Sequence, residues 1–204
     1  WRDVMPFEGN SILGLEARLR GAFVHRADNL PRLLYTATAS ATVANTTTET
    51  SIIGTGIGSL SMPATAVEAL PVTTVPFWFA GKTIRVRVMG YISQLVAGPN
   101  RTVKIYLGST ALGTVGPSSV ATAVTNVGFL YEFLTTCRTT GATGTAFTQA
   151  TLFHSGLGQN YMNATSAVTI DTTTAAALDV KFTWGTGDPG NTITATNVTV
   201  EALN

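Results

Sequence analysis

The residue types that most often carry chemistry are few in this 204-residue sequence, and they stand apart from one another. The chain has two histidines and one cysteine, Cys137. His154 precedes Ser155 and could activate its hydroxyl, but neighbouring strand positions point to opposite faces, and no acid is placed to orient the ring. We therefore interpret His154 as a surface or loop histidine, and Cys137, in a strand-like run, as a buried structural thiol.

Two glycine-containing stretches resemble parts of nucleotide-binding motifs. AGKT at 80–83 has the ending of a phosphate-binding loop, but Pro76 stands where the motif needs glycine, and a strand-like pattern follows instead of a helical one. GTGIG at 54–58 lacks the G-x-G-x-x-G spacing and the strand-to-helix context of a dinucleotide site. We interpret it as a twisted or bulged strand. The sequence predicts no nucleotide cofactor.

Metal ligands are equally sparse. With so few histidines and cysteines, a transition-metal site would need carboxylates, and the acids of the threonine-rich part of the chain are dispersed singly. The GDPGN turn around Asp188 could hold calcium, but a simple turn explains these residues fully. The sequence also shows no paired-carboxylate cluster of the kind that glycoside hydrolases use. We therefore predict a protein that is not an enzyme and needs neither metal nor cofactor.

The charge of the chain narrows the choice of partners. The formal net charge is +1 and only 11% of the residues are charged, so there is no basic stripe for a nucleic-acid backbone. The longest apolar run, at 75–80, is much shorter than the ~20 residues that cross a bilayer. Nucleic acid and membrane are thus not expected partners. So low a charged fraction indicates either that much of the surface faces other protein or that Thr, Ser and Asn solvate it.

The composition changes abruptly near Tyr35. Residues 1–35 contain five Arg and four acidic residues but no threonine, whereas the rest of the chain is rich in Thr, Val, Ile and Gly. Such β-branched residues favour strands, and glycine favours the turns between them. The sequence therefore predicts an N-terminal arm at 1–35, a Thr/Ala-rich connector at 36–49 and a β-domain at 50–204.

Alternating apolar residues in the β-domain predict roughly eight strands. In KTIRVRVMGYISQ (82–94) and RTVKIYLG (101–108) the alternation places one face of each strand in a core. A change of parity in the last strand indicates a bulge near Thr196 or Asn197, and ATAVEAL (64–70) could form one helical turn. The order of strands and turns predicts an all-β, antiparallel two-sheet sandwich of the jelly-roll type. The predicted core residues are Ile84, Val86, Val88, Val103, Ile105, Leu107, Leu178, Val180, Phe182 and Trp184.

The sequence of the arm is compatible with two local structures. Residues after Ser11 could form a short helix with Ser11 as its N-cap, or a strand at 15–26 whose alternate residues share a face; Gly14 and Gly21 favour the strand. Aromatic and arginine side chains of such an arm cannot be buried within it, and these residue types dominate interface energetics. The predicted anchor residues are Trp1, Phe7, Arg18, Arg20, Arg26 and Arg32.

A family resemblance rests on five segments taken in their order along the chain. They are TETSIIGTGIGSLSMPA, GKTIRVRVMGYIS, TVKIYLGSTALGT, GFLYEFLTTCRTTGATGTAFTQATLF and DVKFTWGTGDPGNTITATNVTVEAL. Together they resemble a threonine- and glycine-rich β-domain found in structural proteins of tailed bacteriophages, sometimes within fibre or spike proteins. The resemblance covers about Glu49 to Asn204 and does not extend to the arm. It implies a jelly-roll-like fold, assembly as a homotrimer, and attachment to the particle through an N-terminal segment.

These expectations together predict a non-enzymatic structural protein on the outer surface of a tailed-phage virion. It would be a homotrimer that decorates or cements the capsid or belongs to a tail fibre, with residues 1–35 docked on another virion protein. The alternative is a glycan-binding module of a tail fibre, in which Tyr91, Tyr106 or Tyr161 meets host surface sugars. A third class, a depolymerase, would need carboxylates that meet only in space.

Overall fold

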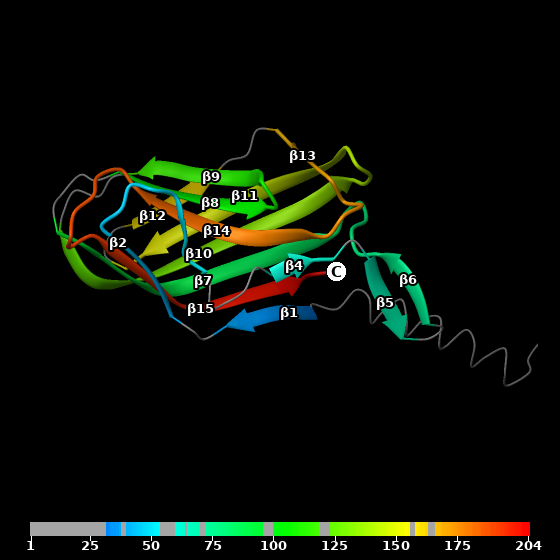
Figure 1. Ribbon diagram of the computed structural model, residues 1–204, viewed down its shortest axis with the longest axis horizontal. Coiled ribbons are helices and arrows are strands. Elements are labelled where there is room, and N and C mark those ends of the chain that lie inside the picture. Colours follow the sequence, from blue (N-terminus) through cyan, green and yellow to red (C-terminus); the bar gives the residue numbers. More distant parts are fainter. Residues whose placement is uncertain are drawn as a thin grey trace, which may run out of the picture.

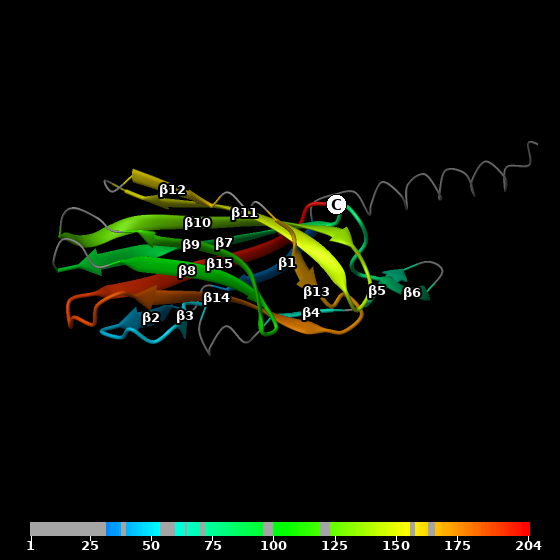
Figure 2. The same cartoon turned by 90° about the horizontal axis from the view of Figure 1, so that it is seen from above.

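A computed structural model describes residues 32–37, 40–53, 60–63, 65–69, 72–95, 100–118, 123–155, 158–162 and 166–204. These residues contain no helix, and their longer strands form two antiparallel sheets that pack against each other (Figures 1 and 2). The prediction of an all-β, two-sheet sandwich is confirmed. The arm lies outside the described residues, together with its alternative helix and strand and the anchor residues Trp1, Phe7, Arg18, Arg20 and Arg26.

Among the described residues, the larger sheet contains eight strands. Its main path runs β1 (Arg32–Ala37), β15 (Thr192–Ala202), β7 (Thr83–Gln94), β10 (Val124–Thr139), β11 (Gly144–His154) and β12 (Gly158–Met162), while β2 (Ala41–Ala44) pairs with β15 and β13 (Val168–Ile170) pairs with β11.

The smaller sheet contains five strands and lies across the first. Its path runs β3 (Thr50–Ser51), β14 (Ala176–Trp184), β8 (Arg101–Leu107) and β9 (Thr110–Ser118), and β4 (Leu60–Met62) also pairs with β14. A separate hairpin, β5 (Thr65–Ala69) and β6 (Val72–Pro76), stands at the end of the sandwich where the C-terminus lies (Figure 1).

A two-stranded ribbon links the two sheets. Strands β7 and β15 pair in the larger sheet, and their neighbours in the chain, β8 and β14, pair in the smaller one. The antiparallel pair of strands therefore continues from one sheet into the other. Jelly rolls share this arrangement. The core lies between the sheets, and every predicted core residue is buried in it, because alternation along each strand sends every second side chain inward.

One local prediction was wrong. Residues 65–69 form strand β5 and not a helical turn, because β-branched Thr65 and Val67 find an extended partner in β6. Within the predicted connector at 36–49, residues 36–37 belong to β1 and residues 41–44 form β2, and both strands pair with β15. The change of composition at Tyr35 therefore falls inside β1, and threonine suits the half-exposed face of such a strand.

A β-bulge in β15 explains one glycine of β7. The pairing of β15 with β7 shifts register between Ala195 and Asn197, which confirms the predicted bulge. The bulge brings the carbonyl oxygen of Thr194 close to Gly90, where a Cβ atom would lie 1.9 Å from that oxygen. No side chain fits at that distance, so glycine is required at position 90 for the central strands to stay paired.

Candidate functional site

His154 does not lie on the surface. Its side chain is 1% exposed, on the inner face of β11, and its Nε2 atom makes a 2.8 Å hydrogen bond with the hydroxyl of Tyr131. The prediction of a surface or loop histidine was therefore wrong. Ala150 and Leu152 occupy alternate positions of the same strand and are buried. The alternation along β11 therefore points the side chain of His154 inward as well. Cys137 is buried, as predicted, and burial raises the pKa of its thiol, which keeps it protonated and unreactive.

Arg101 is the one charged residue among the buried polar side chains of the described part of the chain. It is the first residue of β8, its side chain lies on the same inward face of the strand as that of Val103, and it is only 2% exposed. None of its three guanidinium nitrogens has a hydrogen-bond partner. A guanidinium stays protonated in proteins, and a buried charge without a partner costs several kcal/mol. The sandwich thus contains a positive charge that its described residues leave uncompensated.

Further unpaired polar atoms lie on the strands around Arg101. Trp184 is directly opposite Arg101 in the pairing of β14 with β8, and its buried Nε1–H has no acceptor; the Nδ1 atom of His154 also has no partner. The aromatic rings of Tyr131 and Phe182 are buried beside them. We call Arg101, Tyr131, His154 and Trp184 the buried polar cluster. It combines several donors with an apolar lining.

Burial sets the protonation of the cluster. It lowers the pKa of His154 to about 3, with the positive charge of Arg101 acting in the same direction, and it raises the pKa of the Tyr131 hydroxyl. Burial also lowers the pKa of Arg101. Near neutral pH the histidine and the tyrosine are therefore both neutral, and the guanidinium carries the only charge of the cluster.

We expect the stability of the protein to fall as the pH drops below about 6.5. The unfolded His154 takes up a proton near pH 6.5, while the folded one remains neutral until about pH 3, so protons favour the unfolded state throughout that window. Between pH 7 and pH 5 the free energy of unfolding should fall by about 2 kcal/mol. Urea unfolding at the two pH values measures this loss.

A glutamine at position 154 separates this effect from other titrations. His154→Gln can keep a hydrogen bond to Tyr131 but cannot take up a proton, so its loss between pH 7 and pH 5 should be small. The matched control is His25→Gln at the other histidine, which should leave the wild-type loss unchanged. An equal loss in the wild type and in His154→Gln would show that His154 is not the titrating group.

The outer face of the larger sheet carries an exposed apolar patch. Met89, Leu130 and Phe153 are cross-strand neighbours on β7, β10 and β11, and Tyr91 follows on the same face of β7. Tyr91 and Phe153 are 40% and 41% exposed. We call these four residues the apolar patch.

Paired charges border the apolar patch. Arg87 Nε lies 2.5 Å from Glu132 Oε2, and Arg85 Nη2 lies 2.5 Å from Glu201 Oε2. Each pair joins directly opposed positions of neighbouring strands. Because each positive charge is matched by a negative one within the same face, the outer face of the larger sheet has little net charge around its apolar centre.

The outer face of the smaller sheet has a different character. Glu49 accepts hydrogen bonds from Lys104 at 2.6 Å and from the Tyr106 hydroxyl at 2.7 Å, and the ammonium of Lys181 lies 4.6 Å from the centre of the Tyr106 ring. Asp179 accepts a 2.7 Å hydrogen bond from Ser51. This face is therefore polar, and Tyr106, predicted as a sugar platform, is already occupied by contacts within the chain.

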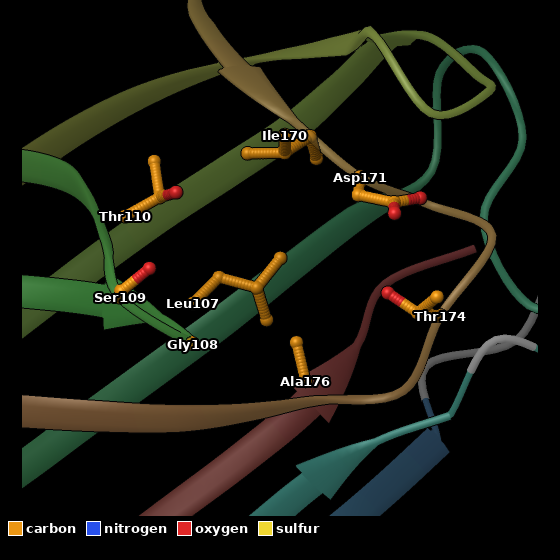
Figure 3. A pocket seen from close by; sticks show the side chains of 8 residues that line it. All are labelled: Leu107, Gly108, Ser109, Thr110, Ile170, Asp171, Thr174 and Ala176. Atoms are coloured by element: carbon orange, nitrogen blue, oxygen red, sulfur yellow. The ribbon is translucent and has the colours of Figure 1, made fainter.

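A small cavity of about 180 Å³ opens near the end of β8. Its lining comes from the β8–β9 turn and from the segment between β13 and β14 (Figure 3). Asp171 at its edge accepts hydrogen bonds from the amide and the hydroxyl of Thr173. The cavity offers hydroxyl groups and one carboxylate but no cation and no aromatic face, so nothing in it selects a ligand. Its lining residues are Leu107, Gly108, Ser109, Thr110, Ile170, Asp171, Thr174 and Ala176.

Other kinds of site are not found in the described part of the chain. No group of three or more His, Cys, Asp or Glu side chains comes together there to hold a metal. Within the same residues, no helix has the length and apolar character needed to span a membrane. Of the predicted anchor residues, the structure describes Arg32, which is exposed on β1. The side chain of Tyr161 lies outside what is described.

Comparison with known proteins leaves the family open. No family model matches the chain, and no curated protein matches it. Among solved structures, the alginate lyase from Klebsiella pneumoniae is similar over 61% of this chain and 59% of that chain, with 9% sequence identity and a TM-score of 0.22. The match thus spans about three fifths of the lyase. A likeness this weak says nothing of fold or activity, so the function must be inferred from the faces of the sandwich.

Proposed function

We propose that this chain is a non-enzymatic structural protein of a tailed-phage virion, a homotrimeric surface protein that decorates or cements the capsid or belongs to a tail fibre. The observation that carries the proposal is the apolar patch on the outer face of the larger sheet. The resemblance of residues 49–204 to β-domains of phage structural proteins supports the virion context. The N-terminal segment attaches the protein to the particle.

The apolar patch has the composition of an assembly surface. Interface cores are depleted of charge and enriched in Tyr, Phe and Met, and the patch combines Met89, Tyr91, Leu130 and Phe153 with charges that are already paired. The polar outer face of the smaller sheet would remain in water. This difference between the faces favours assembly through the larger sheet. It also accounts for a charged fraction of only 11%, because part of the surface meets protein.

The position of β1 supports attachment through the arm. β1 begins at Arg32 and is paired with β15 only on one side along the main path of the larger sheet. The described part of the sandwich therefore begins with a strand at a sheet edge. A segment that joins at an edge can bind another protein without disturbing the fold, which is what docking on the virion requires.

A chain that begins at Arg32 should fold and assemble but should not enter particles. Removal of residues 1–31 keeps all of β1, including Leu34 and Tyr35, which pack against the core. Particle incorporation is measured by supplying full-length or shortened protein to assembling virions that lack it and quantifying the bound protein. We expect at least tenfold less of the shortened protein. Equal incorporation of the two chains would contradict attachment through the arm.

A second truncation serves as the control for folding. A chain that begins at residue 38 also loses β1 and its pairing with β15. It should unfold at a lower urea concentration than the chain that begins at Arg32, because three partly buried side chains and one row of strand hydrogen bonds are lost. The comparison separates the loss of the arm from damage to the sheet.

The alternative function is glycan binding by a tail-fibre module. The exposed ring of Tyr91 favours it, since aromatic faces stack on sugars, and the patch would then be a sugar platform. A glycan array with the wild type and a Tyr91→Ala variant distinguishes the two functions. Specific binding that the variant loses would favour the glycan-binding module over a purely structural protein.

A further inference from the structure

The buried polar cluster contains more hydrogen-bond donors than the described residues can satisfy. The three nitrogens of the Arg101 guanidinium and the Nε1–H of Trp184 have no acceptor, although all of these atoms are shielded from water. Arg101 and Trp184 lie opposite each other on β8 and β14. Tyr131 and His154 face them from the inner side of the larger sheet, and the charge of Arg101 acts on both.

No described acid lies in the interior to balance Arg101. The buried polar side chains are otherwise neutral amides, hydroxyls and the imidazole of His154. Glu49, Glu132 and Glu201 are engaged with other cations on the outer faces. Buried charges in proteins are normally paired, and no described side chain supplies a negative charge for Arg101.

We propose that the buried polar cluster is a binding site for a carboxylate group, held by the guanidinium of Arg101 with the indole N–H of Trp184 as a second donor. A carboxylate is planar and accepts two parallel hydrogen bonds from a guanidinium. Its single negative charge equals the single positive charge of the site. A phosphate or sulfate dianion would bring a second charge into the interior, where it would be unpaired.

The cluster lies toward one end of the sandwich. β7, β11 and β14 end there and β8 begins there, at the end of the sandwich away from the β5–β6 hairpin (Figure 1). The carboxylate can come from two sources: a small free carboxylate or a uronic acid of an acidic glycan. The site is distinct from the apolar patch, and it does not depend on the proposed assembly.

The test is thermal unfolding of the full chain with added anions at constant pH and ionic strength. The probes are acetate and glucuronate, with glucose and chloride as the uncharged and non-carboxylate comparisons. At ten times its dissociation constant, a bound carboxylate should raise the unfolding midpoint by roughly 3 to 6 °C. The variant Arg101→Met should show no rise, whereas the control Arg138→Met, at an exposed arginine, should behave as the wild type.

A second variant keeps the test decisive if Arg101→Met fails to fold. Trp184→Phe retains the guanidinium and removes one donor, so calorimetric titration with acetate should show affinity lowered by roughly tenfold. A response to acetate alone supports a free carboxylate as the ligand, and a stronger response to glucuronate supports an acidic glycan. The absence of any response, an equal response to chloride, or an equal rise in Arg101→Met would overturn the proposal.

Discussion

Replacing Gly90 by alanine is expected to lower the free energy of unfolding by at least about 3 kcal/mol. The new Cβ would lie 1.9 Å from the carbonyl oxygen of Thr194 and 2.9 Å from the Cα of Ala195. Both of these are backbone atoms, so no side chain can rotate to relieve the contact. Strands β7 and β15 would have to separate locally, and the loss would be a large part of the 5–15 kcal/mol typical of a domain.

The neighbouring glycine of the same sheet provides the matched control. Gly128 lies beside this position on β10, opposite Tyr91, and an added Cβ there would find its nearest neighbour at 3.9 Å. Gly128→Ala should therefore change the stability by no more than about 1 kcal/mol. Urea unfolding of the two variants measures the difference. Equal free energies of unfolding for Gly90→Ala and Gly128→Ala would mean that the bulge in β15 leaves room for a side chain at position 90.

Replacing Phe153 by glutamate is expected to separate the proposed trimer into monomers. Phe153 is 41% exposed and lies beside Leu130 in the apolar patch, so the substitution should change the isolated fold little. In an assembly through this face, each subunit would instead bury an unpaired charge. A loss of about 2 kcal/mol or more per interface, typical of a central interface residue, weakens association roughly 30-fold. Sedimentation at several concentrations measures this change.

The control for Phe153→Glu is the same substitution at another exposed phenylalanine. Phe79 is 45% exposed but precedes β7, near the opposite end of the sandwich and away from the patch. Phe79→Glu introduces the same charge on a ring of similar exposure, so it should leave the assembly intact. If both variants dissociate, or if neither does, the apolar patch is not the surface that joins the subunits.

Most of the fold could be predicted from local patterns. Alternation in β7, β8 and β14 identified core residues that the structure buries, and the change of parity in β15 located its bulge. The bounds of β3 and β4 could not be predicted, because their two and three residues are too few to show a period. The role of β1 and β2 was also missed, since it depends on pairing with β15 at the far end of the chain.

Less of the candidate sites could be predicted. Alternation along β8 and β11 places Arg101 and His154 on inward positions. Arg101 was not among the predicted site residues, and His154 was assigned to the surface because no acid is placed to orient its ring. The apolar patch has no signal within any one strand. Met89, Leu130 and Phe153 lie far apart in the sequence and become neighbours only through the register of three strands.

The most direct test of the proposed assembly is the solution mass of the full chain, measured by light scattering. We expect a trimer, with three times the 21.3 kDa of the single chain, and we expect Phe153→Glu to reduce it to the monomer mass. A wild-type chain that remains at 21.3 kDa over the accessible concentrations would contradict assembly through the apolar patch.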